Sequence, residues 1–264
     1  MPGDFDGAVV LVTGASTGLG RAIAVETAKR GAAAVVVHYA SSVDEAEVTA
    51  GQVREAGAEA VLTQGDVADD AACREIAAAA GRFGRIDALF NNAGVTKFAP
   101  RHGDLDAVSG EDFLRLYAVN VVGAFQMVRA ARPLLEKAEL PAVVNTASIA
   151  GVTGIGSSVP YAASKGALTT MTLSLARALA PKIRVNAVCP GFIDTPWFDK
   201  GDPGQRDRMR EAVIAGTPLK AASQAEDIAE ATVFLASRAA RHITGETLLV
   251  DAGTHLGFAP LSRR

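Results

Sequence analysis

The sequence predicts an α/β protein built on an open, mostly parallel, doubly wound β-sheet of about seven strands, with helices on both faces. Three observations lead to this fold class. Short apolar segments rich in valine recur along the chain, as strands buried on both faces require. Segments with apolar residues at helical spacing lie between them. The connections are short, which fits parallel strands joined by crossover helices.

The elements alternate from the beginning of the chain. Residues 8–13 (AVVLVT) form the first expected strand, a glycine turn follows, and a helix over 19–30 ends at Gly31. A strand over 33–39 completes one βαβ unit. The rest comprises helices over 44–56, 70–82, 111–136 and 161–180, the last stopped by Pro181, and strands over 59–64, 87–90, 142–146, 183–189 and 247–250.

The 264 residues are expected to form a single domain, because no linker, composition shift or internal repeat divides them. Its core covers about residues 6–253, and a tail follows at 254–264. Residues 191–218 are the one long irregular interruption of this pattern. Long loops at strand ends are commonly binding loops, so a substrate lid is expected there.

Composition excludes several classes of function. The 26 Lys and Arg against 29 Asp and Glu give a net charge of −3 without a long single-sign block, so no nucleic-acid partner is expected. No apolar run approaches the roughly 18 residues that cross a bilayer, so no membrane partner is expected. Cys73 and Cys189 form neither a metal-binding pair nor a disulfide framework, which favours the reducing cytoplasm.

A glycine turn joins the first strand to the first helix. The segment TGASTGLG (residues 13–20) lets the backbone approach a phosphate at a helix N-terminus, where amides and the helix dipole favour an anion. No Gly-Lys-Ser/Thr follows, which excludes a Walker A loop. A dinucleotide is the expected ligand, and the structural alternative is a tight turn that binds nothing.

The end of the second strand bears on the choice between NAD and NADP. NAD sites usually place Asp or Glu there to hold the ribose 2′-hydroxyl, but this strand ends in His38-Tyr39-Ala40-Ser41-Ser42. Without a carboxylate nothing repels a 2′-phosphate, and the serine hydroxyls and local amides can donate to it. NADP is therefore favoured, with NAD as the alternative.

Four polar residues suggest acid–base chemistry. Tyr161 and Lys165 are four apart at the start of a helix, one turn apart on one face, and an ammonium near a phenol favours the phenolate. Ser148 follows the strand at 142–146, where its hydroxyl can hydrogen-bond the same substrate oxygen. Asn120 lies among apolar helix residues, where an amide needs partners. Each residue also has a structural alternative. Tyr161 and Lys165 could be an ordinary helix pair, Ser148 a turn residue, and Asn120 a core amide with satisfied hydrogen bonds.

Taken together, these motifs resemble those of the classical short-chain dehydrogenase/reductase family. They are the TGxxxGxG turn, NNAG after the fourth strand (91–94), Asn120, Ser148, Tyr161-x-x-x-Lys165, and Pro190-Gly191 after the sixth strand, and their order and spacing match over about residues 6–253. The resemblance implies a Rossmann-like fold and an NAD(P)-dependent enzyme acting on CH–OH or C=O groups. It also implies a homotetramer or homodimer, assembled through the helices at 111–136 and 161–180.

The resemblance assigns roles to matching positions. Tyr161 would exchange a proton with the carbonyl oxygen, Lys165 would lower the pKa of Tyr161 and bind the nicotinamide ribose, Ser148 would orient the carbonyl, and Asn120 would hold a water. With the strand-end residues, the expected cofactor contacts are Gly14, Ser16, Thr17, Gly18, Leu19, Gly20, Tyr39, Ala40, Ser41, Asp66, Val67, Asn92, Ala93, Gly94, Tyr161, Lys165, Pro190, Gly191, Ile193 and Thr195.

The expected substrate walls are residues 96–102, 149–160 and the lid, whose Phe192, Trp197 and Phe198 could close an apolar cover. These segments are mostly small or apolar, which favours a neutral or hydrophobic ketone or secondary alcohol as the small-molecule substrate. The histidines show no ligand spacing and are expected to be solvated or capping residues. No metal is predicted.

Several alternatives stay open. A 3-oxoacyl-(acyl-carrier-protein) reductase needs a basic docking surface, to which Arg129, Arg132 and Lys137 could contribute. An NAD-dependent sugar or alcohol dehydrogenase would share the same motifs. A non-catalytic dinucleotide-binding regulator needs only the glycine turn. A methyltransferase on a similar sheet is disfavoured, because the acidic residue expected at the end of its second strand is absent here.

Overall fold

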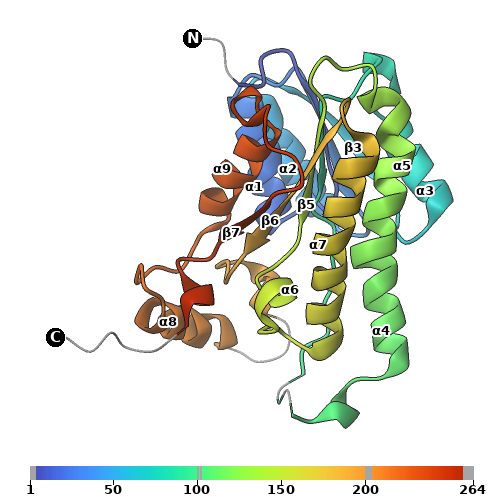
Figure 1. The fold of residues 1–264 in the computed structure, drawn as a ribbon. Coiled ribbons are helices and arrows are strands. Elements are labelled where there is room, and N and C mark those ends of the chain that lie inside the picture. Colours follow the sequence, from blue (N-terminus) through green and yellow to red (C-terminus); the bar gives the residue numbers. More distant parts are fainter. Residues whose placement is uncertain (1–3, 100, 102, 200–203, 258–264) are drawn as a thin grey trace.

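A computed structural model describes residues 4–99, 101, 103–199 and 204–257. Within them one seven-stranded sheet runs in the order β3-β2-β1-β4-β5-β6-β7, and all its neighbouring strands are parallel (Figure 1). The order reverses direction between β1 and β4, which is the point where open α/β sheets bind their ligands. The strands are β1 (Val9–Val12), β2 (Ala34–Tyr39), β3 (Glu59–Gln64), β4 (Ala88–Asn91), β5 (Ala142–Thr146), β6 (Arg184–Pro190) and β7 (Thr247–Val250).

Helices cover both faces of the sheet because the strand side chains alternate between two apolar clusters. Val10 and Val12 of β1 face a cluster that also holds residues of α1, α2 and α9, whereas Val9 and Leu11 face residues of α3, α5 and α7 (Figure 1). The helices are α1 (Gly18–Lys29), α2 (Val43–Glu55), α3 (Asp70–Ala78), α4 (Gly110–Tyr117), α5 (Ala124–Leu135), α6 (Ala150–Thr153), α7 (Val159–Leu179), α8 (Gln205–Gly216) and α9 (Ala225–Ala236).

The predicted fold class is confirmed, and the strands at 59–64, 142–146 and 247–250 have the predicted ends. The single helix expected over 111–136 is wrong in one respect. A π-helical segment, Ala118–Gly123, interrupts it between α4 and α5. Such segments insert a residue into the helical ladder and often occur at functional sites.

The expectation of an irregular stretch over 191–218 is also wrong. A 3₁₀ turn, Pro196–Asp199, and α8 lie there, although residues 200–203 are outside the described part of the chain. Helix α9 follows, where no helix was predicted. Among the described residues, no helix is both long and apolar enough to span a membrane. Pro100 and His102 of the expected substrate wall, and the tail beyond residue 257, also lie outside the described residues.

Candidate active site

The glycine turn forms a backbone cradle at the carboxyl end of β1. Gly14 and Gly18 have positive φ, +62° and +54°. A Cβ on Gly20 would lie 2.1 Å from the Gly14 carbonyl oxygen and 2.5 Å from Nδ2 of Asn92, so only glycine fits. Thr17 is the N-cap of α1, yet its side chain makes no capping hydrogen bond. The first-turn amides are thus left without a side-chain acceptor, which suits a phosphate.

The turn after β4 closes one side of this cradle. Asn92 donates from Nδ2 to the Gly14 carbonyl at 3.0 Å, and a Cβ on Gly14 would lie 2.8 Å from Cα of Ala93. Thr13, which the sequence analysis did not single out as a site residue, accepts at Oγ1 from the amides of Asn92 and Ala93. The position of Gly94 is less restricted, since a Cβ there would lie 3.3 Å from Oδ1 of Asn120 and 3.6 Å from Nζ of Lys165.

The turn after β3 provides a second wall. Asp66 accepts from the Ala68 amide at 2.9 Å, and the buried Val67 packs against Gly123 of the π-helical segment. Gln126 of α5 donates from Nε2 to the Val67 carbonyl at 2.9 Å. Gln126 is buried and polar, yet nothing in its sequence surroundings marked it as a support of this turn.

The end of β2 offers backbone and hydroxyl groups but no acid. Ala40 and Ser41 are exposed, and the Ala40 carbonyl accepts from Nε2 of Gln64 at 3.0 Å. Arg21 does not serve this strand end directly. Its guanidinium donates to the Ser16 carbonyl and forms an ion pair with Glu45 of α2, so its charge is already compensated.

Three candidate catalytic side chains converge at the carboxyl ends of β5 and β6. Tyr161 and Lys165 lie in the first turns of α7, and Nζ of Lys165 is 5.8 Å from the centroid of the Tyr161 ring. Ser148, just after β5, lies beside the phenol and acts to lower its pKa, while its Oγ accepts from the Ala150 amide at 3.1 Å. Lys165 is 4% exposed and donates to the Thr146 carbonyl at 2.7 Å. The predicted grouping of Ser148, Tyr161 and Lys165 is therefore present.

Burial controls the ionisation of this group. Loss of solvation raises the pKa of Tyr161 to about 12, and the neighbouring Ser148 side chain only partly opposes the rise. Burial likewise lowers the pKa of Lys165 to about 8. The sequence predicts that Lys165 lowers the pKa of Tyr161. In the structure the shift has the opposite direction, because Lys165 donates to the Thr146 carbonyl and the phenol is desolvated.

Asn120 lies in the π-helical segment and is 1% exposed. Its Oδ1 accepts from the Val95 amide at 2.8 Å, and its Nδ2 donates to the Val95 carbonyl and to Oγ of Ser164, both at 3.0 Å. Both polar atoms of the side chain therefore take part in joining α7 to the loop after β4, and Oδ1 keeps a second acceptor site.

The segment after β6 lies against the glycine turn. The amide of Gly191 donates to the Val250 carbonyl at 3.1 Å, and a Cβ on Gly18 would lie 3.6 Å from the methyl of Thr195. Pro190 and Ile193 link this segment to its neighbours through backbone contacts, with the Ile149 amide and with Ser223 respectively. Of the two expected carboxamide-side residues, Thr195 is thus beside the cradle, and Ile193 pairs with Ser223.

Aromatic rings bridge two loops of the expected substrate wall. The ring of Phe198 lies 4.8 Å from that of Phe192 and 6.2 Å, edge to face, from that of Phe98. Phe98 belongs to the loop after β4, whose Ala99 amide donates to the Ser157 carbonyl just before α7. These contacts join three parts of the expected substrate wall: the loop after β4, the segment after β6 and the segment before α7.

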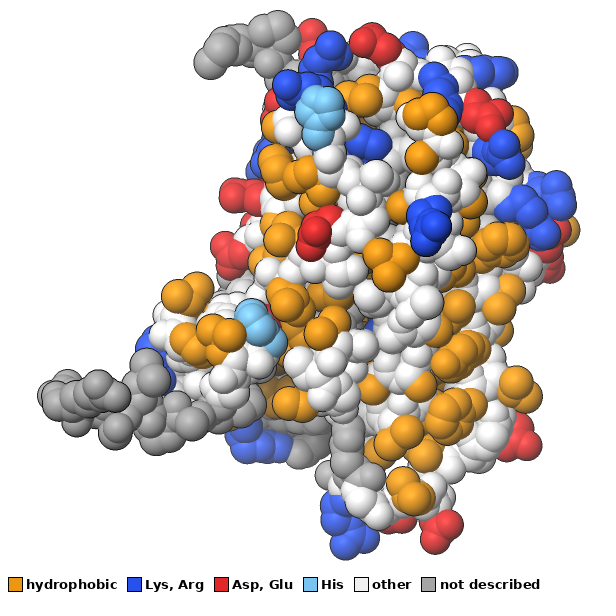
Figure 2. All heavy atoms as spheres, viewed as in Figure 1, with side chains coloured by type: hydrophobic (Ala, Val, Ile, Leu, Met, Phe, Trp, Pro, Cys, Tyr) orange, Lys and Arg blue, Asp and Glu red, His pale blue; other side chains and the backbone are white. Residues whose placement is uncertain are grey.

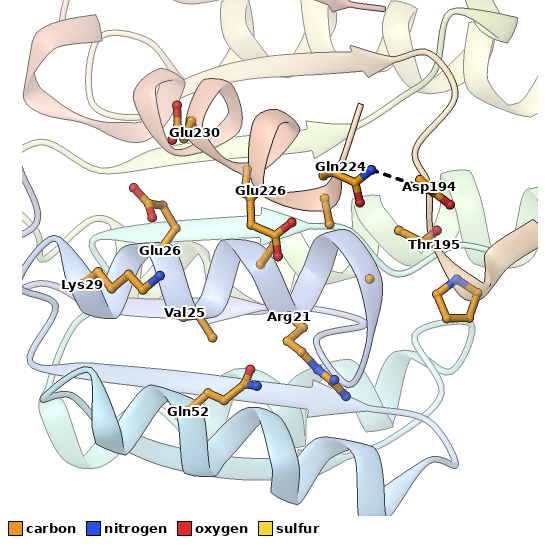
Figure 3. A pocket seen from close by; sticks show the side chains of 15 residues that line it. Arg21, Val25, Glu26, Lys29, Gln52, Asp194, Thr195, Gln224, Glu226 and Glu230 are labelled. Carbon is orange, nitrogen blue, oxygen red and sulfur yellow. Dashed lines mark hydrogen bonds between the residues drawn. The ribbon is translucent and has the colours of Figure 1, made fainter. Parts of the chain in front are cut away.

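A cavity of about 460 Å³ lies elsewhere, on the outer side of α1, between α1, α2 and α9 (Figure 3). Charged side chains of both signs line it, among them Lys29 and Glu226. At its end nearest the glycine turn, Gln224 hydrogen-bonds to Asp194 at 3.5 Å. Tyr161 is not among its lining residues, so this cavity is not the candidate active site.

A phosphate cradle at the switch point, next to a Ser–Tyr–Lys group, defines a dinucleotide-dependent oxidoreductase. A family model described as enoyl-(acyl carrier protein) reductase matches residues 14–255. The chain belongs to the classical short-chain dehydrogenase/reductase family, whose members use a nicotinamide dinucleotide to act on CH–OH or C=O groups.

Individual relatives cover almost the whole chain. A protein named as a ketoacyl reductase of the granaticin polyketide synthase, from Streptomyces violaceoruber, is 41% identical over 94% of this chain and 96% of its own. A Staphylococcus aureus 3-oxoacyl-(acyl-carrier-protein) reductase is 35% identical over 93% and 97%. The crystal structure of a short-chain dehydrogenase/reductase from Burkholderia xenovorans superposes with a TM-score of 0.86 at 39% identity, covering 95% and 98%.

Proposed function

We propose that the protein reduces a neutral or hydrophobic ketone to a secondary alcohol with NADPH, and that Tyr161 donates the proton. The observation that carries the proposal is the position of the Tyr161 side chain, beside Ser148 and with its ring centroid 5.8 Å from Nζ of Lys165. When bound, the reduced nicotinamide supplies a hydride to the carbonyl carbon. The residues of this chain then have to bind the carbonyl oxygen and protonate it.

The ionisation of the site favours reduction. With a pKa of about 12, Tyr161 is protonated at neutral pH and can act as the acid. Lys165, with a pKa of about 8, is mainly an ammonium at pH 7 and stabilises the phenolate that forms. Ser148 can hydrogen-bond the carbonyl oxygen as its charge develops. In the balanced reaction, one ketone, one NADPH and one proton give one alcohol and one NADP⁺.

The end of β2 supports NADP over NAD. No carboxylate follows Tyr39 until Asp44, so nothing at the strand end repels a 2′-phosphate. Ser41 is exposed, and Ser42, the N-cap of α2, makes no side-chain capping bond to the amides of that helix. Hydroxyl and amide donors therefore replace a basic residue, since Arg21 is paired with Glu45.

The aromatic cluster of Phe98, Phe192 and Phe198 supports an apolar substrate, because it presents ring surface at the wall of the site. The names of two relatives favour the second candidate, reduction of a 3-oxoacyl chain on a carrier protein. Of the three expected docking residues, Arg129 pairs with Asp70 and Arg132 pairs with Glu136, whereas Lys137 is exposed.

The proposed assembly is a homodimer or homotetramer. Figure 2 shows hydrophobic side chains gathered over α4, α5 and α7, and the exposed residues there include Phe113, Leu114, Val122, Phe125 and Leu173. Patches of this kind mark interaction sites. Both cysteines are free and buried, which is consistent with the proposed cytoplasmic location.

Tyr161→Phe tests the catalytic role. We expect it to lower kcat for ketone reduction by about 10²–10⁴-fold, since it removes the general acid, while NADPH affinity stays within about threefold of wild type. Turnover is followed by loss of NADPH absorbance with an aryl ketone, a small ketone and a 3-oxoacyl carrier thioester.

Tyr117→Phe, in α4, makes the same change outside the group and should retain activity. Full activity in Tyr161→Phe would contradict the mechanism. NADPH binding without turnover of any carbonyl by wild type would favour a non-catalytic regulator. Turnover of the carrier thioester alone would favour the second candidate.

A further inference from the structure

His38 is buried at the end of β2 and was expected to be a solvated or capping residue. It is 1% exposed instead, and both of its ring nitrogens have backbone partners. The Gly14 amide donates to Nδ1 at 3.1 Å, and Nε2 lies 3.0 Å from the Gly65 carbonyl. The ring therefore bridges the carboxyl ends of β1 and β3, the two strands that flank β2.

These contacts fix the protonation state of the ring. Nδ1 accepts a hydrogen bond from an amide, so it carries no proton, and Nε2 must carry the proton that it donates to Gly65. A second proton would sit on Nδ1 and face the N–H of Gly14. The ring could then no longer hold that amide, and one of the two groups would have to move.

Both anchored segments belong to the cofactor cradle. Gly14 opens the phosphate-binding turn, and its carbonyl also accepts from Asn92. Gly65 directly precedes Asp66 and Val67, the wall on the other side of β2. The backbone of His38 adds a third tie, because its carbonyl accepts from the Ala15 amide at 2.8 Å.

We propose that neutral His38 is a positioning residue for dinucleotide binding, whose ring sets the distance between the phosphate turn at Gly14 and the turn at Gly65–Asp66. The inference rests on the proposed function in that the ligand is a dinucleotide. It adds a pH dependence of cofactor affinity that originates in the protein.

The groups around the His38 ring determine the pH range in which cofactor affinity changes. Burial lowers the pKa of His38, and it outweighs the hydrogen bond to Gly65 and the field of Asp66, which both act to raise it. Asp66, from the β3 side, is the charged group of the described residues that acts on the ring. From the β1 side the ring meets the Gly14 amide. Cofactor affinity should therefore be constant at neutral and alkaline pH, and it should fall only where acid protonates His38, below the ordinary histidine pKa of about 6.5.

Calorimetric titration with NADP⁺, which is stable in acid, tests the proposal between pH 5 and pH 8. Four proteins are compared: wild type, His38→Gln, His38→Phe and the control His242→Gln, which makes the same change at an exposed histidine. The 2′-phosphate itself titrates near pH 6. Its effect is common to all four proteins, so the difference between them is the readout. Thermal unfolding at each pH confirms that each protein is folded.

Toward pH 5 we expect wild type and His242→Gln to lose more affinity than His38→Gln, because only they carry an ionisable ring at position 38. His38→Phe should bind about tenfold more weakly than wild type even at pH 8, because the Gly14 amide loses its acceptor.

Parallel pH profiles of wild type and His38→Gln would overturn the positioning role while leaving the proposed function intact. Absence of NADP⁺ binding by wild type at pH 8 would overturn both. If His38→Phe does not fold, the comparison of wild type with His38→Gln still decides.

Discussion

The ammonium of Lys165 is buried in the interior with little opposite charge to compensate it. It is 4% exposed and donates to the Thr146 carbonyl, and no ion pair found among the described residues includes it. Burial lowers its pKa to about 8 from an ordinary value of 10.5. The unfolded chain therefore binds more protons than the native protein between pH 8 and 10.5, and native stability rises with pH across that window.

Lys165→Met should accordingly stabilise the protein while abolishing its activity. At pH 7 we expect the free energy of unfolding to increase by about 1–3 kcal/mol, because the buried charge is removed. The increase should shrink as pH rises above 8, where native wild type sheds its proton. Urea unfolding at pH 7 and pH 9.5 measures both effects, and a variant less stable than wild type at both pH values would contradict this account.

At this scale the sequence predicted the reacting group but not its electrostatics. Tyr161, Lys165 and Ser148 follow from spacing and position after strands. The direction of the Tyr161 pKa shift does not, because it depends on how much water surrounds the phenol. His38 and Gln126 were missed because a lone buried polar residue leaves no pattern, and their partners are backbone groups of distant segments.

Among the elements, the glycine turn tolerates substitution least. Gly20→Ala should lower the free energy of unfolding by about 1–3 kcal/mol and remove stabilisation by NADPH, because its Cβ would collide with the Gly14 carbonyl. Gly51→Ala is the matched control, since a Cβ at this position of α2 meets nothing within 4 Å.

The control should raise the unfolding free energy by about 0.5–1 kcal/mol, because alanine suits a helix interior better than glycine. Thermal unfolding with and without NADPH separates the two variants. Equal NADPH stabilisation of Gly20→Ala and wild type would refute the role of the turn.

Elements with an apolar stripe or valine-rich core were predictable, and those without were not. Helix α8 buries no residue, so no helical stripe is visible in its sequence. The π-helical segment at Asn120 arises from contacts with Val95 and Ser164, which local propensity cannot indicate. Helix α9 did carry a signal, the capping box of Gln224 and Asp227 ahead of the apolar Ile228 and Val233.

At the scale of the whole molecule, the exposed apolar face over α4, α5 and α7 predicts self-association (Figure 2). Leu114→Glu, at a leucine that is 72% exposed, should convert the assembly to a smaller species, because burying a carboxylate in an apolar interface is costly. Val48→Glu, on exposed α2, should leave the mass unchanged. Light scattering measures both, and a monomeric wild type would contradict the proposed assembly.

The central claim is that this chain transfers a hydride from NADPH to a ketone. The most direct test incubates the wild-type protein with NADPH deuterated at C4 of the nicotinamide and an aryl ketone, in parallel with deuterated NADH at the same concentration, and analyses the alcohol by mass spectrometry. We expect one deuterium on the carbinol carbon and more product from NADPH. Absence of labelled alcohol from a protein that binds NADPH would contradict the claim, and more product from NADH would overturn the cofactor preference.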